Sequence, residues 1–204
     1  MNSFDLFGYH LINQWAGYVP LLDMFMSFTA QYALELYGLL FLIAWFTLPK
    51  SEGDRRHALV VAGFSGVLAL IINVLVSHIW FRPRPFVSLQ KGSFTQLIPH
   101  SNDASFPSDH VSGSFAFAAG SWKNSDHWVS YSFTSLAIIV AVARIYTGVH
   151  WPTDVLAAAI VGLLSARIMW AINPLMKPVS QFGLRLFHFG QYASTPSSKE
   201  NHLD

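Results

Sequence analysis

Long apolar stretches separated by short polar loops make up most of the chain. Five of them carry almost no charged residues, and about 20 such residues are needed to cross a bilayer as a helix. They predict membrane-spanning helices over residues 21–48, 58–80, 106–122, 128–147 and 152–173. The third and fourth are short, so we expect them to start or stop near a membrane face.

The first twenty residues follow a different pattern. Apolar side chains recur there at spacings of three and four, which places Phe4, Phe7, Leu11, Trp15 and Tyr18 on one stripe. This spacing predicts an amphipathic helix with one apolar face. We expect it to lie in the membrane interface or to insert as a sixth helix. A signal peptide is disfavoured because the basic region that begins one is absent.

Residues 1–176 are expected to form a single membrane domain. The remainder, 177–204, is expected to be a cytoplasmic tail. It begins with a short amphipathic piece that contains Phe182, Leu186 and Phe187. It ends in a polar run that is typical of disordered chain.

The composition supports a bilayer as the solvent. Hydrophobic residues make up 52% of the chain and charged residues 11%, whereas a soluble domain has about 25% charged residues. A soluble helical protein is the alternative, but five apolar segments leave too little polar surface to cover them. A net charge of +1 provides no field for nucleic acid. The absence of cysteine excludes disulfides and thiol catalysis.

Basic residues are distributed unevenly among the loops. The loop 49–57, the loop 122–127 and the C-terminal tail hold most of them. Because basic loops tend to stay in the cytoplasm, we expect this side of the molecule to be cytoplasmic. The loop 82–105 and the turn 144–151 are then expected to face outward.

Unusual polar residues gather on that outward side in three segments. The segments read FRPRPF at 81–86, SFPSDH at 105–110 and ARIYTGVHWPTD at 143–154. Ionisable side chains at one depth of a membrane are costly unless they share a site. The segments therefore predict a functional site at the outer ends of the helices.

The middle segment has the features of an anion site at a helix start. Pro107 suits the first position of a helix, where its missing N–H does no harm. The free amides of Ser108, Asp109 and His110 would then bind an anion together with the Ser108 hydroxyl. His110 is also a candidate acid that protonates a leaving oxygen.

The outer two segments supply charge and a nucleophile. Arg84 and Arg144 carry planar guanidinium groups that match phosphate oxygens. Pro152 indicates a second helix start, which puts Asp154 at the third position, where its carboxylate can fold back toward His150. An imidazole oriented in this way can attack as a nucleophile. These residues suffice for phosphoryl transfer without a metal.

A metal site is the alternative for the same residues. Two histidines, His110 and His150, and two carboxylates, Asp109 and Asp154, are adequate ligands. The two neighbouring arginines would repel a cation. We therefore expect no metal and no other cofactor.

The three segments resemble the motifs of the type 2 phosphatidic acid phosphatases (PAP2), which are shared with vanadium haloperoxidases and bacterial acid phosphatases. The family motifs read K-x6-R-P, P-S-G-H and S-R-x5-H-x3-D. This chain has Arg84-Pro85, Pro107-Ser108-Asp109-His110 and Ala143-Arg144-x5-His150-x3-Asp154 in the same order. The second and third motifs together are specific, whereas an R-P pair alone is not.

The resemblance implies a phosphohistidine mechanism. His150 would attack the terminal phosphorus with help from Asp154, and His110 would protonate the leaving group. Water would then release phosphate. Backbone amides and the side chains of Arg84, Arg144 and Ser108 would hold the phosphate oxygens.

Three positions depart from the family motifs. Ser77 stands where the family has lysine, and Arg82 is a candidate to supply the missing charge. Ala143 replaces a serine. Asp109 replaces a glycine and brings a carboxylate near a phosphate site, where it would cap the helix dipole or turn away.

Glu35 is a further candidate because it lies near the middle of the first predicted span. An acid at that depth is a functional hypothesis by default. A structural acid paired with Ser77 or His78 is the equal alternative. The histidines at 57, 100 and 127 are interpreted as loop residues.

A longer run narrows the resemblance. Pro83-Arg84-Pro85-Phe86 without the motif lysine, and Pro99-His100-x2-Asp103-x-Ser105-Phe106-Pro107-Ser108-Asp109-His110, look like the undecaprenyl-diphosphate phosphatases associated with bacitracin resistance. We therefore expect an all-α, polytopic bundle in the bacterial cytoplasmic membrane. Its outward-facing site is expected to hydrolyse undecaprenyl diphosphate to the monophosphate and so recycle the carrier lipid of cell-wall synthesis.

Two alternatives to this function stay open. A phosphatidate or phosphatidylglycerophosphate phosphatase would keep the chemistry and change the lipid. A protein that only binds or transports lipid headgroups would use the cations without the nucleophile. In each case the expected partners are a lipid phosphate and membrane lipids, not nucleic acid.

Overall fold

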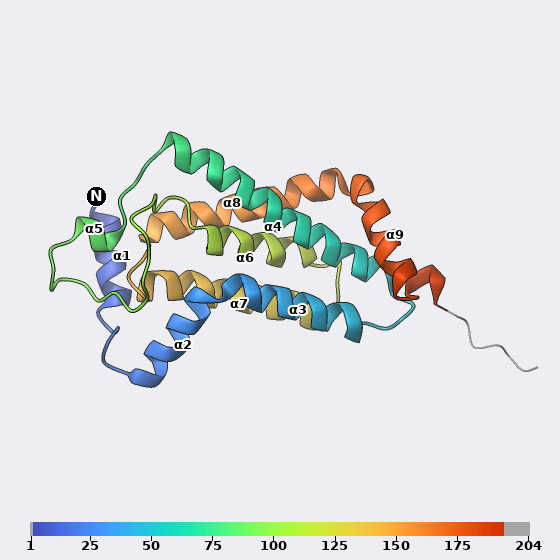
Figure 1. Ribbon diagram of the computed structural model, residues 1–204, viewed down its shortest axis with the longest axis horizontal. Coiled ribbons are helices and arrows are strands. Elements are labelled where there is room, and N and C mark those ends of the chain that lie inside the picture. The colour runs from blue at the N-terminus through green and yellow to red at the C-terminus, as the bar shows by residue number, and fades with distance from the viewer. Residues whose placement is uncertain (1, 194–204) are drawn as a thin grey trace, which may run out of the picture.

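Helices account for all regular structure in the computed structural model, which describes residues 2–193 (Figure 1). The α-helices are α1 (Ser3–Asn13), α2 (Pro20–Gln31), α3 (Ala33–Thr47), α4 (Gly53–Ile79), α5 (Pro85–Ser88), α6 (Asp109–Ser121), α7 (His127–Tyr146), α8 (Pro152–Ala171) and α9 (Lys177–Leu186). Two 3-10 turns, Asn173–Met176 and Gly190–Tyr192, flank α9. The expectation of an all-α bundle is confirmed.

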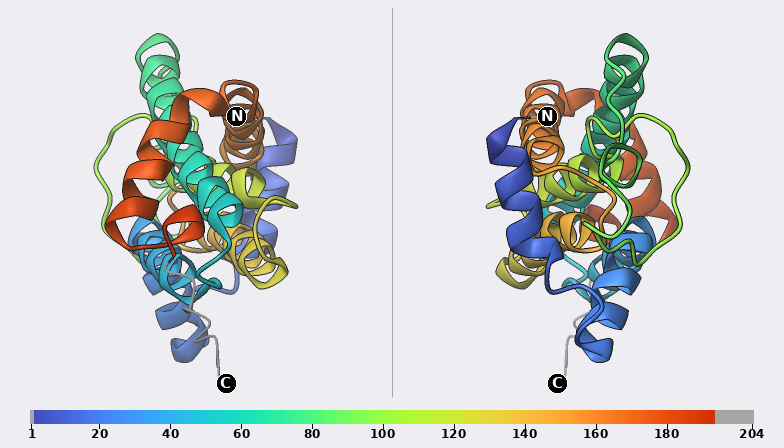
Figure 2. Two further views of the ribbon diagram at one scale, coloured as in Figure 1. Left: turned by 90° about the vertical axis from the view of Figure 1, so that its right-hand side faces the viewer. Right: turned by 90° about the vertical axis from the view of Figure 1, so that its left-hand side faces the viewer.

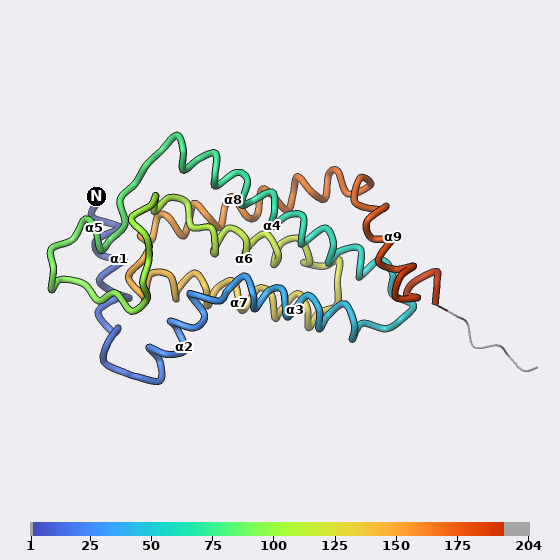
Figure 3. Tube along the Cα trace, viewed as in Figure 1, coloured from blue at the N-terminus to red at the C-terminus, as the bar shows by residue number. Residues whose placement is uncertain are grey.

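Three helices, α4, α7 and α8, are long and apolar enough to cross a bilayer. α2 and α3 together would form a fourth span, but they are bent by 76° at their junction (Figure 3). The segment predicted as one span over 21–48 is therefore broken at Tyr32. Neither proline nor glycine stands at the break, so the local sequence does not explain it.

α6 packs against four other helices, α3, α4, α7 and α8 (Figures 1 and 2). Eight of its thirteen residues are buried. Thirteen residues extend only about 20 Å, which is less than the ~30 Å hydrocarbon core of a bilayer. α6 is thus shorter than the span predicted over 106–122, and the segment before it forms a loop at one end of the bundle.

Two glycines allow the close packing around α6. A Cβ atom at Gly120 would lie 2.6 Å from the Cα of Ala62 on α4. A Cβ atom at Gly162 on α8 would lie 2.5 Å from the carbonyl oxygen of Ser112. Because both neighbours are backbone atoms that cannot move aside cheaply, these two contacts require glycine.

Gly120→Ala and Gly162→Ala are expected to lower the melting temperature, since forced overpacking costs about 1–3 kcal/mol. Gly63→Ala on α4 is the matched control, because its added Cβ meets nothing within 4 Å. The control is expected to melt at the wild-type temperature or slightly above it. Thermal unfolding in detergent measures the effect, and equal melting temperatures for all three variants would contradict the packing described.

α1 presents an apolar face outward and a polar face toward the protein. Its predicted stripe is exposed, and the exposed side chains include Phe4, Phe7 and Leu11. Asp5, Tyr9 and Asn13 on the opposite face are buried. Eleven residues extend about 16 Å, so α1 is too short to cross a membrane. The outward stripe suits a helix that lies in the interface.

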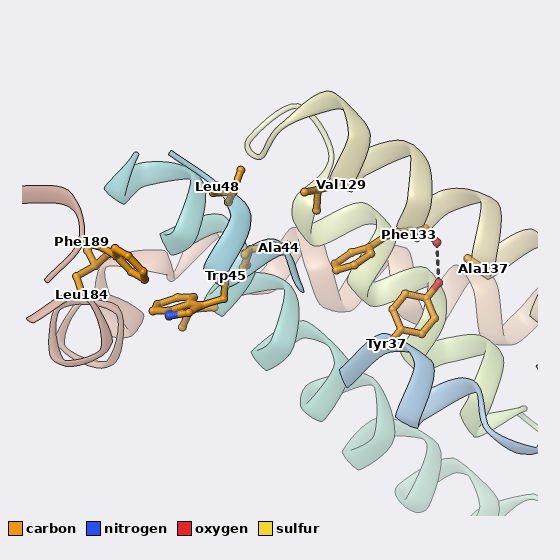
Figure 4. Close-up of a cluster of buried hydrophobic side chains, with 12 residues drawn as sticks. Tyr37, Ala44, Trp45, Leu48, Val129, Phe133, Ala137, Leu184 and Phe189 are labelled. Atoms are coloured by element: carbon orange, nitrogen blue, oxygen red, sulfur yellow. Dashed lines mark hydrogen bonds between the residues drawn. The ribbon is translucent and has the colours of Figure 1, made fainter. Parts of the chain in front are cut away.

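Arg56 organises the opposite end of the bundle. Its side chain is fully buried and packs over the ring of Phe189, 3.9 Å from the centroid. The guanidinium donates to the carbonyl oxygens of Trp45, Leu48, Pro49 and Glu52. Arg56 therefore closes the C-terminal end of α3 beside the buried cluster drawn in Figure 4. α9 matches the amphipathic piece expected after residue 177, and the polar end predicted beyond 193 lies outside the described residues.

Candidate active site

The three motif segments meet at the end of the bundle where α1 and α5 lie (Figure 1). There they border a cavity of about 240 Å³. The cavity wall includes six residues singled out from the sequence: Ser77, Arg84, Asp109, His110, Arg144 and His150. Four others, Arg82, Ser108, Asp154 and Glu35, are part of the described chain but lie outside this wall.

His150 has one ring nitrogen directed at the cavity arginines and the other at the backbone. Nε2 lies 3.1 Å from Nη1 of Arg84 and 3.1 Å from Nη2 of Arg144, so it accepts from both guanidinium groups. Nδ1 donates to the carbonyl oxygen of Ser105 over 2.8 Å. This network assigns the proton to Nδ1 and leaves Nε2 unprotonated, which is the state that a nucleophile needs. Burial, together with the positive charges of Arg144 and Arg84, lowers the pKa of His150 well below its usual range.

Asp154 forms hydrogen bonds with the residues around His150 and not with the imidazole itself. As predicted, Pro152 is the first residue of α8 and Asp154 stands at its third position. The Asp154 carboxylate accepts from the backbone N–H of Trp151. The predicted contact with His150 is longer, because the carboxylate oxygen lies 3.6 Å from Nδ1. The same oxygen accepts from the Ser105 hydroxyl over 2.5 Å. Asp154 thus fixes Ser105, whose carbonyl orients His150.

The two cavity arginines are buried and held by carbonyl groups. Arg84 donates to the carbonyls of Val149 and Ala104. Arg144 donates to the carbonyl of Ala30, beside the break between α2 and α3. The Nε of Arg144 is buried and has no partner within the described residues. Arg84 also pairs with the carboxylate of Asp103. Two guanidinium groups fixed side by side make this cavity complementary to a phosphate.

His100 and Asp103 belong to the site although the sequence reading left them in a loop. His100 lines the cavity, and its Nε2 accepts from Arg144 over 3.1 Å. Burial and the two arginines lower the pKa of His100. Burial opposes ionisation of Asp103, but hydrogen bonds from Ser101 and Arg84 outweigh it and lower its pKa. Both residues belong to the run from Pro99 to His110 that resembles the undecaprenyl-diphosphate phosphatases. That resemblance was the one sequence signal that could have assigned them to the site.

The start of α6 is shifted by two residues from its predicted place. Ser108 is the N-cap and Asp109 the first helical residue, so Pro107 precedes the helix. The free amides therefore begin at Asp109. The carboxylate of Asp109 accepts from Asn73 over 2.9 Å. The Ser108 hydroxyl is buried with no partner among residues 2–193.

The sequence matches the model of a known protein family. A family model of the PAP2 superfamily matches residues 58–176. The chain belongs to the PAP2 superfamily. It is 33% identical over 167 residues to the undecaprenyl-diphosphatase BcrC of Bacillus subtilis (strain 168). The aligned region covers 81% of this chain and 82% of BcrC.

Two solved structures share the fold. LpxE of Aquifex aeolicus gives a TM-score of 0.68 at 24% identity, over 83% of this chain and 96% of that one. A transmembrane PAP2-type phosphatidylglycerolphosphate phosphatase from Bacillus subtilis gives 0.57 at 21% identity, over 86% and 89%. With its family and fold established, this PAP2 phosphatase is a multi-pass membrane protein.

Arg82 does not replace the missing motif lysine of this PAP2 phosphatase. Its guanidinium pairs with Asp154 and with Asp5 of α1, away from the cavity. That prediction was wrong because two buried carboxylates compete for the charge. Ser77 does line the cavity, but its hydroxyl donates to the carbonyl of Val74.

Glu35 lies in the first turn of α3, exposed, and outside the cavity wall. Within the described residues neither Ser77 nor His78 bonds to it, since both donate to Val74. The suggested pairing is therefore wrong. Within residues 2–193, no group of three or more His, Asp or Glu side chains is arranged to hold an ion.

His150 gives this PAP2 phosphatase a pH-dependent stability. Its folded pKa lies below the unfolded value near 6.5, so below that pH the unfolded chain takes up a proton that the folded site does not. Stability is therefore expected to fall as pH decreases from about 7.5 to about 5. The melting temperature of His150→Gln is expected to fall less than that of wild type over that range. An equal loss in both proteins would contradict a buried, neutral His150.

Proposed function

We propose that this PAP2 phosphatase hydrolyses undecaprenyl diphosphate to undecaprenyl phosphate and inorganic phosphate through a phosphohistidine at His150. The observation that carries the proposal is the Nε2 lone pair of His150, which two buried guanidinium groups flank at 3.1 Å. A site for headgroup capture alone needs the cations but has no use for an oriented nucleophile. The BcrC relative supports the choice of lipid.

The first chemical step transfers the terminal phosphoryl group to the enzyme. Nε2 of His150 forms a bond to the terminal phosphorus while the bond from phosphorus to the bridging oxygen breaks. The electron pair of that bond stays on the bridging oxygen of the departing monophosphate, and His110, which lines the same cavity, gives it a proton. Arg84 and Arg144 stabilise the charge on the transferred oxygens.

The second step returns the enzyme to its starting state. Water attacks the phosphorus, the bond to Nε2 breaks, and His110 takes up the proton of the water. Asp154 acts through Ser105, which keeps the Nδ1 proton in place as positive charge develops on the imidazole. The amides at the start of α6 are further donors to the phosphate. Ser108 is buried and is not among the residues that line the cavity, so we assign its hydroxyl a weaker part.

The surroundings of the cavity suit a lipid phosphate. Val74 borders both the polar cavity and an apolar surface groove on α4. Val67, Ile71 and Leu75 in that groove are exposed apolar side chains. A phosphate bound in the cavity would thus place its hydrocarbon tail against α4 within the bilayer. We place the cavity on the extracytoplasmic face, since most basic loops belong to the opposite end.

Phosphate release from undecaprenyl diphosphate, phosphatidate and phosphatidylglycerophosphate, measured in detergent with EDTA, tests the proposal. Wild type is expected to prefer the diphosphate. His150→Ala is expected to lose at least about 10³-fold in kcat, the scale of removing a nucleophile. His127→Ala is the matched control, because this histidine is exposed at the start of α7 at the other end of the bundle.

Each contrary result would overturn a different part of the proposal. Full activity of His150→Ala would exclude the phosphohistidine. Loss of wild-type activity in EDTA would favour the metal alternative. A preference for phosphatidate or phosphatidylglycerophosphate would change the substrate, and binding of these lipids without any hydrolysis would favour headgroup capture.

A further inference from the structure

Asp5 is a fully buried carboxylate on α1, the short outer helix. One of its oxygens pairs with Nη2 of Arg82 over 2.5 Å. The other accepts from the backbone N–H and from the hydroxyl of Thr153, both over 2.9 Å. Thr153 precedes Asp154 in the first turn of α8. The first helix of the chain therefore reaches α8, the helix that carries Asp154.

Arg82 is held between two carboxylates. Its Nη1 donates to Asp154 over 2.6 Å, while its Nη2 donates to Asp5. The planar fork of an arginine suits two such bonds at once. No other lysine or arginine of residues 2–193 forms an ion pair with either carboxylate. Because an uncompensated buried charge is strongly destabilising, one guanidinium has to serve both acids.

The bonds continue from Arg82 to the proposed nucleophile. Asp154 uses one oxygen for Arg82 and the other for the Ser105 hydroxyl. The carbonyl of Ser105 accepts the Nδ1 proton of His150. Asp5 is thus joined to His150 through three residues, although 145 positions separate them in the chain and Asp5 itself lies outside the cavity wall.

We propose that Asp5 is a positioning residue for His150. It holds Arg82 against Asp154, and the fixed Asp154 keeps Ser105 and hence the imidazole in the tautomer with Nε2 free. Without Asp5 the guanidinium of Arg82, whose side chain is 19% exposed, can turn toward solvent and release Asp154. The kinetic part of this proposal rests on the proposed function, whereas the effect on the His150 tautomer does not.

A purely structural role for Asp5 is distinguishable because α1 is anchored independently. The side chain of Asn13 bonds to Thr95 and to the carbonyl of Tyr146. The ring of Tyr9 packs against Trp151 at 5.4 Å. These contacts keep α1 in place when the charge of Asp5 is removed.

Asp5→Asn tests the proposal, with Tyr9→Phe as the matched control on the same buried face. The hydroxyl of Tyr9 has no partner within the described chain, so its removal should leave kcat unchanged. Asp5→Asn is expected to lower kcat about 10–100-fold, as loss of an outer orienting group does. KM should stay within about twofold, because Arg84 and Arg144 are untouched. Asp5→Glu should recover part of the loss.

A histidine tautomer measurement makes the test independent of substrate. In protein labelled with nitrogen-15 histidine, the His150 signals, assigned by their absence in His150→Gln, are expected to show an Nδ1-protonated ring in wild type. Asp5→Asn should show a mixture of tautomers. Asp5→Asn, Arg82→Gln and the double variant should share one kinetic defect, since they break the same connection.

The outcomes separate this proposal from the proposed function. An unchanged tautomer in Asp5→Asn, or a loss of folded protein with unchanged kcat per active site, would overturn the positioning role. If wild type hydrolyses no lipid phosphate, the proposed function fails, while a changed tautomer in Asp5→Asn would still support the positioning of His150 by Asp5.

Discussion

Two buried guanidinium groups donate to one imidazole nitrogen, and the rest of the structure depends on this arrangement. The positive charges of Arg84 and Arg144 repel each other, and both side chains are almost wholly removed from water. Such a pair is stable only when fixed acceptors surround it. The same fixed geometry explains the function of the pair, because a phosphate that enters the cavity meets oriented donors that need little reorganisation.

The fold supplies those acceptors from places far apart in the chain. The break between α2 and α3 brings the carbonyl of Ala30 to Arg144. The turn before α8 brings the carbonyl of Val149 to Arg84, and the loop before α6 brings Asp103. The short, closely packed α6 begins where this loop ends. Features that look irregular in a helical bundle are therefore the ones that hold the charges.

The sequence predicted the reacting side chains better than it predicted the residues that orient them. Motif spacing placed Arg84, His110, Arg144 and His150 at one cavity, since each residue lies at a helix end on the same side of the membrane. A capping box is local, so the fold of Asp154 back to the N–H of Trp151 was also predictable. These features depend on short stretches of chain.

The supports could not be predicted because they are contacts between distant segments. Arg82 pairs with Asp5 across 77 positions, and Ser105 joins Asp154 across 49. His100 looked like a loop histidine because only the folded loop brings it to Arg144. The break at Tyr32 has no local signal either. A single sequence contains no information that pairs such residues.

Rapid quenching tests most directly the claim that His150 is the nucleophile which the two arginines flank. Undecaprenyl diphosphate radiolabelled in its terminal phosphate would be mixed with the enzyme, quenched in base and the protein digested for mass spectrometry. The account predicts transient label on the peptide that contains His150 and none in His150→Ala. Turnover by wild type with no labelled histidine, or with label on a different residue, would contradict it.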